Sequence, residues 1–283
     1  MKSKICSYCS IIIFIVSFIN IAHGQEHGKP KIVTTISPIA GIISMLVGDE
    51  AEVVSLNNNG GCPHHYHLKP SDMMKINEAD IIIYVDEKFD GGIEKLSKKS
   101  YAHIIKISNN KQINLIDQLG KVNYHFWLDL NNILPLQQEV ANYLIKIRPG
   151  IKQALINNQA KALQDINALM NLKDAQLRNL PQLVVMSDSL EHFFSKVNLD
   201  IVKAYQSKNA SLQNYAKLEQ ILKKDKDKCI ILDSSQNIDL YKKFNKTIVQ
   251  LDSENWQIND GNISRDLFFN KYVQMINDLK NCR

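Results

Sequence analysis

The chain has 283 residues, of which 45% are hydrophobic and 22% are charged, and its formal net charge is +5 at pH 7. This is the composition of an ordinary globular protein and excludes a disordered chain. The positive charge is small and the lysines are scattered or mixed with acidic residues, so we expect no nucleic-acid partner. A chain of this length is near the size at which one core divides into two lobes.

The N-terminus has the pattern of a secretory signal peptide. Two lysines precede an apolar run over residues 11–19, and small residues follow at the cleavage position, residues 22–24. The run is shorter than the about 20 residues that a membrane-spanning helix needs. We therefore expect residues 1–24 to be removed and the rest to be exported to the periplasm. A buried N-terminal helix of a cytosolic protein is the alternative.

Strand-like runs alternate with helical patterns through both halves of the chain, which predicts an α/β fold with a mainly parallel sheet in each half. In the first half we expect strands at 31–36, 51–56, 81–85 and 103–107, and helices at 39–47 and 70–78. In the second half we expect strands at 182–186, 200–204, 229–232 and 247–251, and a closing helix at about 264–279. Gly48 should end the first helix, and Ser71 and Asp72 can cap the second.

A helical pattern without further glycine or proline extends from Gly150 to about residue 177. Its apolar residues recur at helical spacing, which predicts one long helix. We interpret residues 148–177 as a rigid linker helix between an N-terminal lobe, 25–147, and a C-terminal lobe, 178–283. A surface helix of one continuous domain would have the same pattern.

Three cysteines follow the predicted signal peptide: Cys62, Cys229 and Cys282. In an oxidising compartment two of the three should pair. We expect Cys229, in a predicted strand, to pair with Cys282, after the last predicted helix. Cys62 would then be left over, two residues from His64, either as an unligated thiol or as a metal ligand.

Histidines mark the candidate site. His64, His65 and His67 share one loop between a predicted strand and a predicted helix, at the sheet edge where α/β folds bind ligands. His125 stands alone in an apolar segment, and Asp252 directly follows a predicted strand. Taken singly, these residues also fit solvated loop histidines, a core histidine and a helix cap. Together, imidazoles and a carboxylate suit zinc and its neighbours in the transition series.

Several segments, in this order, resemble the metal-binding solute-binding proteins of ABC importers, in particular the periplasmic zinc-uptake group. The resemblance spans nearly the whole mature chain and rests on Val-Thr-Thr-Ile-Ser-Pro-Ile at 33–39, Pro-His-His-Tyr-His-Leu-Lys-Pro-Ser-Asp at 63–72, Glu-Ala-Asp-Ile-Ile-Ile-Tyr at 78–84, His-Phe-Trp-Leu-Asp at 125–129 and Leu-Asp at 251–252. It implies that His64, His125 and Asp252 are metal ligands. It also implies a monomer that carries a divalent ion, zinc first with manganese or iron as alternatives, to an ABC permease.

One departure concerns the third ligand of that family, a histidine in zinc proteins and often a glutamate in manganese proteins. Ser187 stands at this position, so we expect three protein ligands and a water molecule in a tetrahedral site. His192 is expected to pack in the core instead of binding metal. The stretch between residues 84 and 125 also lacks the His- and Asp-rich loop that many zinc-uptake proteins carry.

Three ligands and an open position would also suit a periplasmic zinc hydrolase. Such an enzyme needs a general base, yet no His-Glu-x-x-His pattern occurs, and we expect only Glu191 among the glutamates near the candidate ligands. A surface adhesin with a structural metal is a third interpretation, disfavoured because no cysteine stands where a lipid anchor would need it. We therefore expect a binding protein and not an enzyme.

Overall fold

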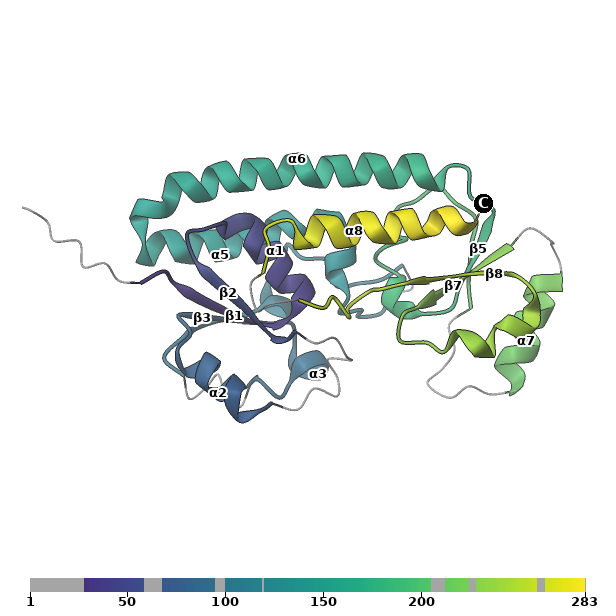
Figure 1. Cartoon of the computed structure of the whole chain (residues 1–283), viewed down its shortest axis with the longest axis horizontal. Helices are drawn as coiled ribbons and strands as arrows, with labels where there is room; N and C mark the ends of the chain where they lie inside the picture. Colours follow the sequence, from purple (N-terminus) through teal and green to yellow (C-terminus); the bar gives the residue numbers. More distant parts are fainter. Residues whose placement is uncertain are drawn as a thin grey trace, which may run out of the picture.

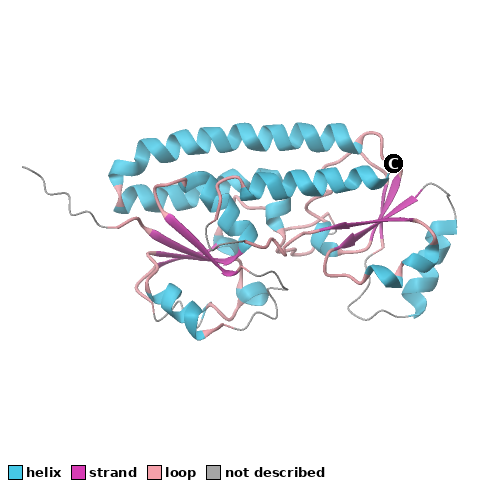
Figure 2. Cartoon of the chain, in the orientation of Figure 1, coloured by secondary structure: helices cyan, strands magenta, loops and turns pink. Residues whose placement is uncertain are grey.

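The computed structural model describes residues 28–58, 68–94, 100–118, 120–204, 212–223, 228–258 and 263–282. Two lobes, each built on a four-stranded parallel sheet, lie side by side beneath a layer of long helices (Figures 1 and 2). The predicted α/β class with two lobes is confirmed. The predicted signal peptide and the loop that carries Cys62, His64, His65 and His67 lie outside the described residues.

The N-terminal sheet has the strand order β2-β1-β3-β4. Its elements, each strand within one residue of the predicted bounds, are β1 (Lys31–Ile36), β2 (Glu52–Asn57), β3 (Ile81–Tyr84) and β4 (His103–Lys106), with helices α1 (Ser37–Val47), α2 (Pro70–Asn77) and α3 (Glu87–Asp90). Ile81 and Ile83 enter the main core, whereas Ile82 packs with Ile76 of α2 on the other face. Because both faces are covered, β3 is an unbroken apolar run.

Local sequence sets the ends of the first two helices. α1 ends at Gly48, whose φ of +51° is in the left-handed region that favours glycine. In α2 the carboxylate of Asp72 accepts a hydrogen bond from the backbone N–H of Lys69 at 2.8 Å. The predicted stop of α1 and the predicted cap of α2 by Asp72 are therefore confirmed.

The C-terminal sheet repeats the topology of the first, with the order β6-β5-β7-β8. Its elements are β5 (Gln182–Val185), β6 (Ile201–Lys203), β7 (Lys228–Asp233) and β8 (Thr247–Leu251), with helix α7 (Leu212–Lys223). In each sheet the second strand pairs with one side of the first strand, and the third strand pairs with its other side. The first strands, β1 and β5, therefore lie inside their sheets. Such crossover points form crevices at the carboxyl ends of the strands.

Long helices form the layer above the two sheets. They are α5 (Ile133–Ile147), α6 (Lys152–Leu177) and α8 (Leu267–Asp278). α6 is the predicted linker helix, and α8 runs beside it and also packs on α1 (Figure 1). A Cβ atom at Gly41 would lie 3.2 Å from the backbone N of Phe268, so glycine permits the close approach of α1 and α8. Two packed helices therefore span the lobes, where the sequence predicted one.

Cys229 of β7 and Cys282, in the 3-10 turn after α8, form a disulfide, which confirms the predicted pair. The bond staples the C-terminal end of the α8 segment to the second sheet. Among the described residues, no helix is long and apolar enough to cross a membrane.

Candidate metal-binding site

His125 precedes the 3-10 turn Phe126–Leu128, in the segment between β4 and α5. Its ring meets the ring of Phe89 edge-on at a centroid distance of 5.6 Å and lies 5.2 Å from the ring of Trp127. The imidazole side chain is 14% exposed. His125 is therefore a mostly buried histidine whose ring packs against aromatic neighbours.

Asn123 sets the orientation and tautomer of this imidazole. Its Oδ1 accepts a hydrogen bond from the backbone N–H of His125 at 3.0 Å and lies 3.0 Å from Nδ1 of the same ring. Because an amide oxygen accepts and cannot donate, Nδ1 carries the proton. In the neutral ring the lone pair is then on Nε2, the nitrogen available to a metal.

Nε2 of His125 lies 3.1 Å from Oε2 of Glu254, 129 positions further along the chain. The Glu254 side chain is 8% exposed. The expectation that only Glu191 among the glutamates lies near the candidate ligands is wrong, because Glu254 contacts His125. Glu191 forms an ion pair with Lys203. The missed signal was the position of Glu254, two residues after Asp252.

Asp252 directly follows β8, as predicted, at the carboxyl edge of the second sheet. Its Oδ1 accepts hydrogen bonds from the backbone N–H of Asn255 at 2.7 Å and from the hydroxyl of Ser234 at 3.2 Å. Burial raises the pKa of the Asp252 carboxyl group, and these two hydrogen bonds oppose that rise. Asp252 is thus held at the edge where β7 and β8 end.

The segments that carry His125 and Asp252 are tied together by an indole group. Nε1 of Trp127 donates to the backbone carbonyl of Ser253 at 2.8 Å. Nε1 of Trp256 donates to the carbonyl of Asp252 at 2.9 Å and so fixes the turn after β8. The polar ends of two buried tryptophans therefore position the backbone around the candidate ligands.

Ser187 follows β5, at the same sheet edge as Asp252. Its Oγ lies 2.8 Å from Oγ of Ser189 and accepts a hydrogen bond from the backbone N–H of Ser189 at 3.3 Å. Ser189 in turn donates to Asp233 at 3.2 Å. The hydroxyl of Ser187 is therefore engaged in its own turn.

His192 is buried, with 1% exposure, and its Nε2 lies 3.1 Å from the backbone carbonyl of Asn123. Burial lowers the pKa of this imidazole. The prediction that His192 packs in the core is confirmed.

Within the described ranges, no three histidine, cysteine, aspartate or glutamate side chains gather as a metal-binding group. Among the described residues, the side chains of His125 and Glu254 are in contact, and Asp252 lies on the same segment as Glu254. The predicted ligand His64 is outside the described ranges. An imidazole nitrogen and carboxylate oxygens are donors that fit zinc and its transition-series neighbours.

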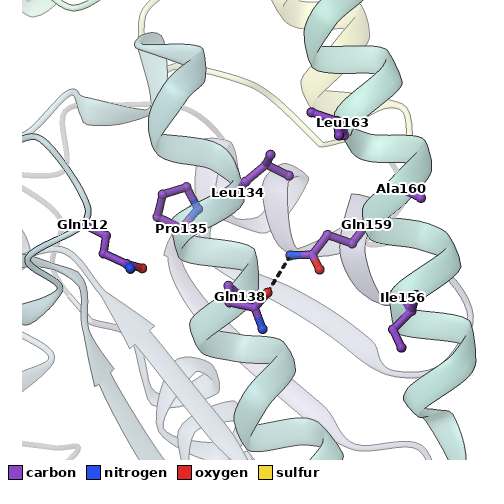
Figure 3. Close-up of a pocket in the computed structure, with 8 residues that line it drawn as sticks. All are labelled: Gln112, Leu134, Pro135, Gln138, Ile156, Gln159, Ala160 and Leu163. Carbon is purple, nitrogen blue, oxygen red and sulfur yellow. Dashed lines mark hydrogen bonds between the residues drawn. The ribbon is translucent and has the colours of Figure 1, made fainter.

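A groove of about 640 Å³ between α5 and α6 is a separate feature (Figure 3). Apolar and amide side chains line it: Gln112, Leu134, Pro135, Gln138, Ile156, Gln159, Ala160 and Leu163. Because these residues include no carboxylate, imidazole or thiol, the groove offers no strong metal ligand.

The sequence model of the family described as zinc-uptake complex component A, periplasmic, matches residues 32–282. Uncharacterized protein RP014 of Rickettsia prowazekii is 42% identical over 259 residues, which cover 91% of this chain and 85% of that protein. The metal ABC transporter substrate-binding lipoprotein FimA of Streptococcus parasanguinis is 28% identical over 183 residues, which cover 60% of this chain and 59% of FimA.

Solved structures show the same fold. The crystal structure of ZnuA superposes with a TM-score of 0.75 at 17% identity and covers 90% of this chain and 100% of that chain. The structure of the solute-binding protein FpvC from Pseudomonas aeruginosa in complex with Mn²⁺ gives a TM-score of 0.70 at 20% identity. The superposition covers 90% of this chain and 98% of the FpvC chain. With the family model matched over residues 32–282, the chain belongs to the family of periplasmic zinc-uptake complex component A.

Proposed function

We propose that the chain is a periplasmic solute-binding protein that captures a divalent transition-metal ion between its lobes and delivers it to an ABC permease. The proposed ligands are His64, His125 and Asp252. The observation that carries the proposal is the position of Nε2 of His125, whose ring is oriented by Asn123 and which lies 3.1 Å from the Glu254 carboxylate in the other half of the chain. Residues 1–24 are proposed to direct export, and the mature protein is proposed to act as a monomer.

The mechanism is binding without chemical change. Neutral imidazoles and a carboxylate replace the hydration shell of the ion, and the loaded protein then docks on the permease. α6 and α8 pack along each other and connect the two lobes. This packing supports a capture step with little hinge motion, because a wide opening would have to break the contacts between these helices.

Zinc is the first candidate because histidine nitrogen and carboxylate oxygen suit its four-coordinate shell. Manganese and iron remain alternatives, since manganese favours more oxygen donors. PsaA of Streptococcus pneumoniae, named a manganese ABC transporter substrate-binding lipoprotein, is 28% identical over 182 residues, which cover 59% of each chain. Each metal-binding titration should therefore be carried out with Mn²⁺ as well as with Zn²⁺.

The test compares reversible loading with turnover. Chelator-treated protein is loaded with Zn²⁺ or Mn²⁺, its bound metal is quantified, and hydrolysis of model esters and peptides is followed on the same samples. We expect one ion per chain, full release to chelator and no turnover above metal in buffer. Metal-dependent hydrolysis that disappears with His125→Ala would contradict the proposal and support a zinc hydrolase.

A further inference from the structure

We propose that Glu254 is a ligand of the transported metal ion and supplies the donor that Ser187 does not. This inference rests on the proposed function and adds a residue to its site. It starts from the contact of 3.1 Å between Oε2 of Glu254 and Nε2 of His125.

The spacing of these two atoms fits a shared ion. Two ligand atoms that bind one tetrahedral zinc ion at about 2.0–2.1 Å lie about 3.3 Å from each other. The observed separation of 3.1 Å is close to this value. Both donor atoms can therefore reach one ion with a shift of a few tenths of an ångström.

The two atoms are placed to share a cation. Asn123 Oδ1 accepts a hydrogen bond from Nδ1 of His125, so Nε2 is the ring nitrogen that faces the carboxylate of Glu254. The two groups attract each other only with a proton or a metal ion between them. The Glu254 side chain is 8% exposed, so few water molecules compete with an ion for its carboxylate.

Position in the fold supports the assignment. Glu254 lies two residues beyond Asp252, and the intervening Ser253 accepts the indole hydrogen bond of Trp127 at 2.8 Å. The backbone that carries Glu254 is therefore fixed to the segment that carries His125. By contrast, the hydroxyl of Ser187 is bound to Ser189. A carboxylate from the segment after β8 thus takes the role of the family's third ligand.

The experiment compares Glu254→Gln with Glu219→Gln, a matched control that removes the same charge from an exposed position on α7. Zinc affinity is measured by chelator competition, and the absorption spectrum of the Co²⁺-loaded protein reports its coordination. We expect Glu254→Gln to lose more than about 100-fold in affinity, beyond the about 10–100-fold cost of losing a residue that only supports a ligand. The Co²⁺ spectrum should change, and Glu219→Gln should match the wild type in both measurements.

Glu254→Asp keeps the carboxylate on a shorter stem and should recover part of the affinity, and circular dichroism of the metal-free variants checks their folding. The proposal is overturned if Glu254→Gln binds zinc within about 100-fold of the wild type with an unchanged Co²⁺ spectrum, since its carboxylate would then only support His125. If the wild type itself binds neither Zn²⁺ nor Mn²⁺ tightly, the proposed function fails first and this inference fails with it.

Discussion

The indole N–H of Trp127 donates to the backbone carbonyl of Ser253 over 2.8 Å, although the two residues are 126 positions apart and both are fully buried. Trp127 lies two residues after His125, and Ser253 lies between Asp252 and Glu254. One hydrogen bond therefore joins the segment that carries His125 to the segment that carries Asp252 and Glu254.

Trp127→Phe keeps an aromatic ring but removes the donor. The carbonyl of Ser253 would then be buried without this partner, which costs about 1–3 kcal/mol of the free energy of unfolding. Because the ligand segments would be less well fixed, zinc affinity should fall by about 10–100-fold, the cost of losing a supporting residue. Urea denaturation and chelator competition measure the two effects. If Trp127→Phe had the wild-type free energy of unfolding and the wild-type zinc affinity, the hydrogen bond between Trp127 and Ser253 would not organise the site.

Cys282→Ser removes the disulfide to Cys229, which closes a sequence separation of 53 residues. The free energy of unfolding should fall by about 4 kcal/mol under oxidising conditions by the chain-entropy estimate. Cys229 lies near the start of β7, whereas the candidate ligand Asp252 follows the end of β8, so zinc affinity at 25 °C should stay within a factor of about two. Urea denaturation with and without reductant tests this. Equal stabilities of variant and oxidised wild type would contradict the structural role of the bond.

Lys173 of α6 is buried, and its Nζ donates to the backbone carbonyl of Phe193 at 2.9 Å and lies 3.4 Å from the hydroxyl of Tyr272. Burial lowers the pKa of its amine from 10.5 to about 8. Between these two pH values the unfolded chain binds more protons than the folded chain, so this residue makes the free energy of unfolding rise with pH.

In Lys173→Met that rise is absent. The stability difference between wild type and variant should therefore shift by about 3 kcal/mol in favour of the wild type between pH 7.5 and pH 10.5, since each pKa unit is worth about 1.4 kcal/mol. Urea denaturation across this range gives the two curves. Parallel curves would mean that the amine titrates alike in both states.

Strand positions could be predicted because strands buried on both faces leave unbroken apolar runs, as Ile81, Ile82 and Ile83 do in β3. The place of Asp252 followed from the same signal, since the residue after a parallel strand lies at the ligand-binding edge. Helix α5 was missed although its buried residues recur at helical spacing: Ile133, Leu136, Val140 and Leu144.

The contact between His125 and Glu254 could not be predicted from periodicity. It depends on how two segments pack across 129 positions, and no local pattern encodes that distance. The engagement of Ser187 with Ser189 likewise depends on the turn geometry after β5.

Ser187→Ala should change zinc affinity by less than about tenfold, because the hydroxyl bonds within its own turn. Loss of this cap should cost about 1 kcal/mol of the free energy of unfolding. Ser187→His should also leave zinc affinity within about tenfold, because His64, His125, Asp252 and Glu254 already fill the four-coordinate shell of zinc. Competition titration with zinc and manganese measures both variants. A loss in Ser187→Ala as complete as that in His125→Ala would make the serine a true ligand.

The most direct test of metal capture is a chelator-competition titration with Zn²⁺ on the wild type, His125→Ala and His103→Ala. His103 is the matched control, an exposed histidine of β4 that stacks on Tyr143 at a centroid distance of 3.8 Å. The account predicts one tightly bound ion in the wild type and in His103→Ala, and loss of that binding in His125→Ala. Wild-type affinity in His125→Ala would contradict it.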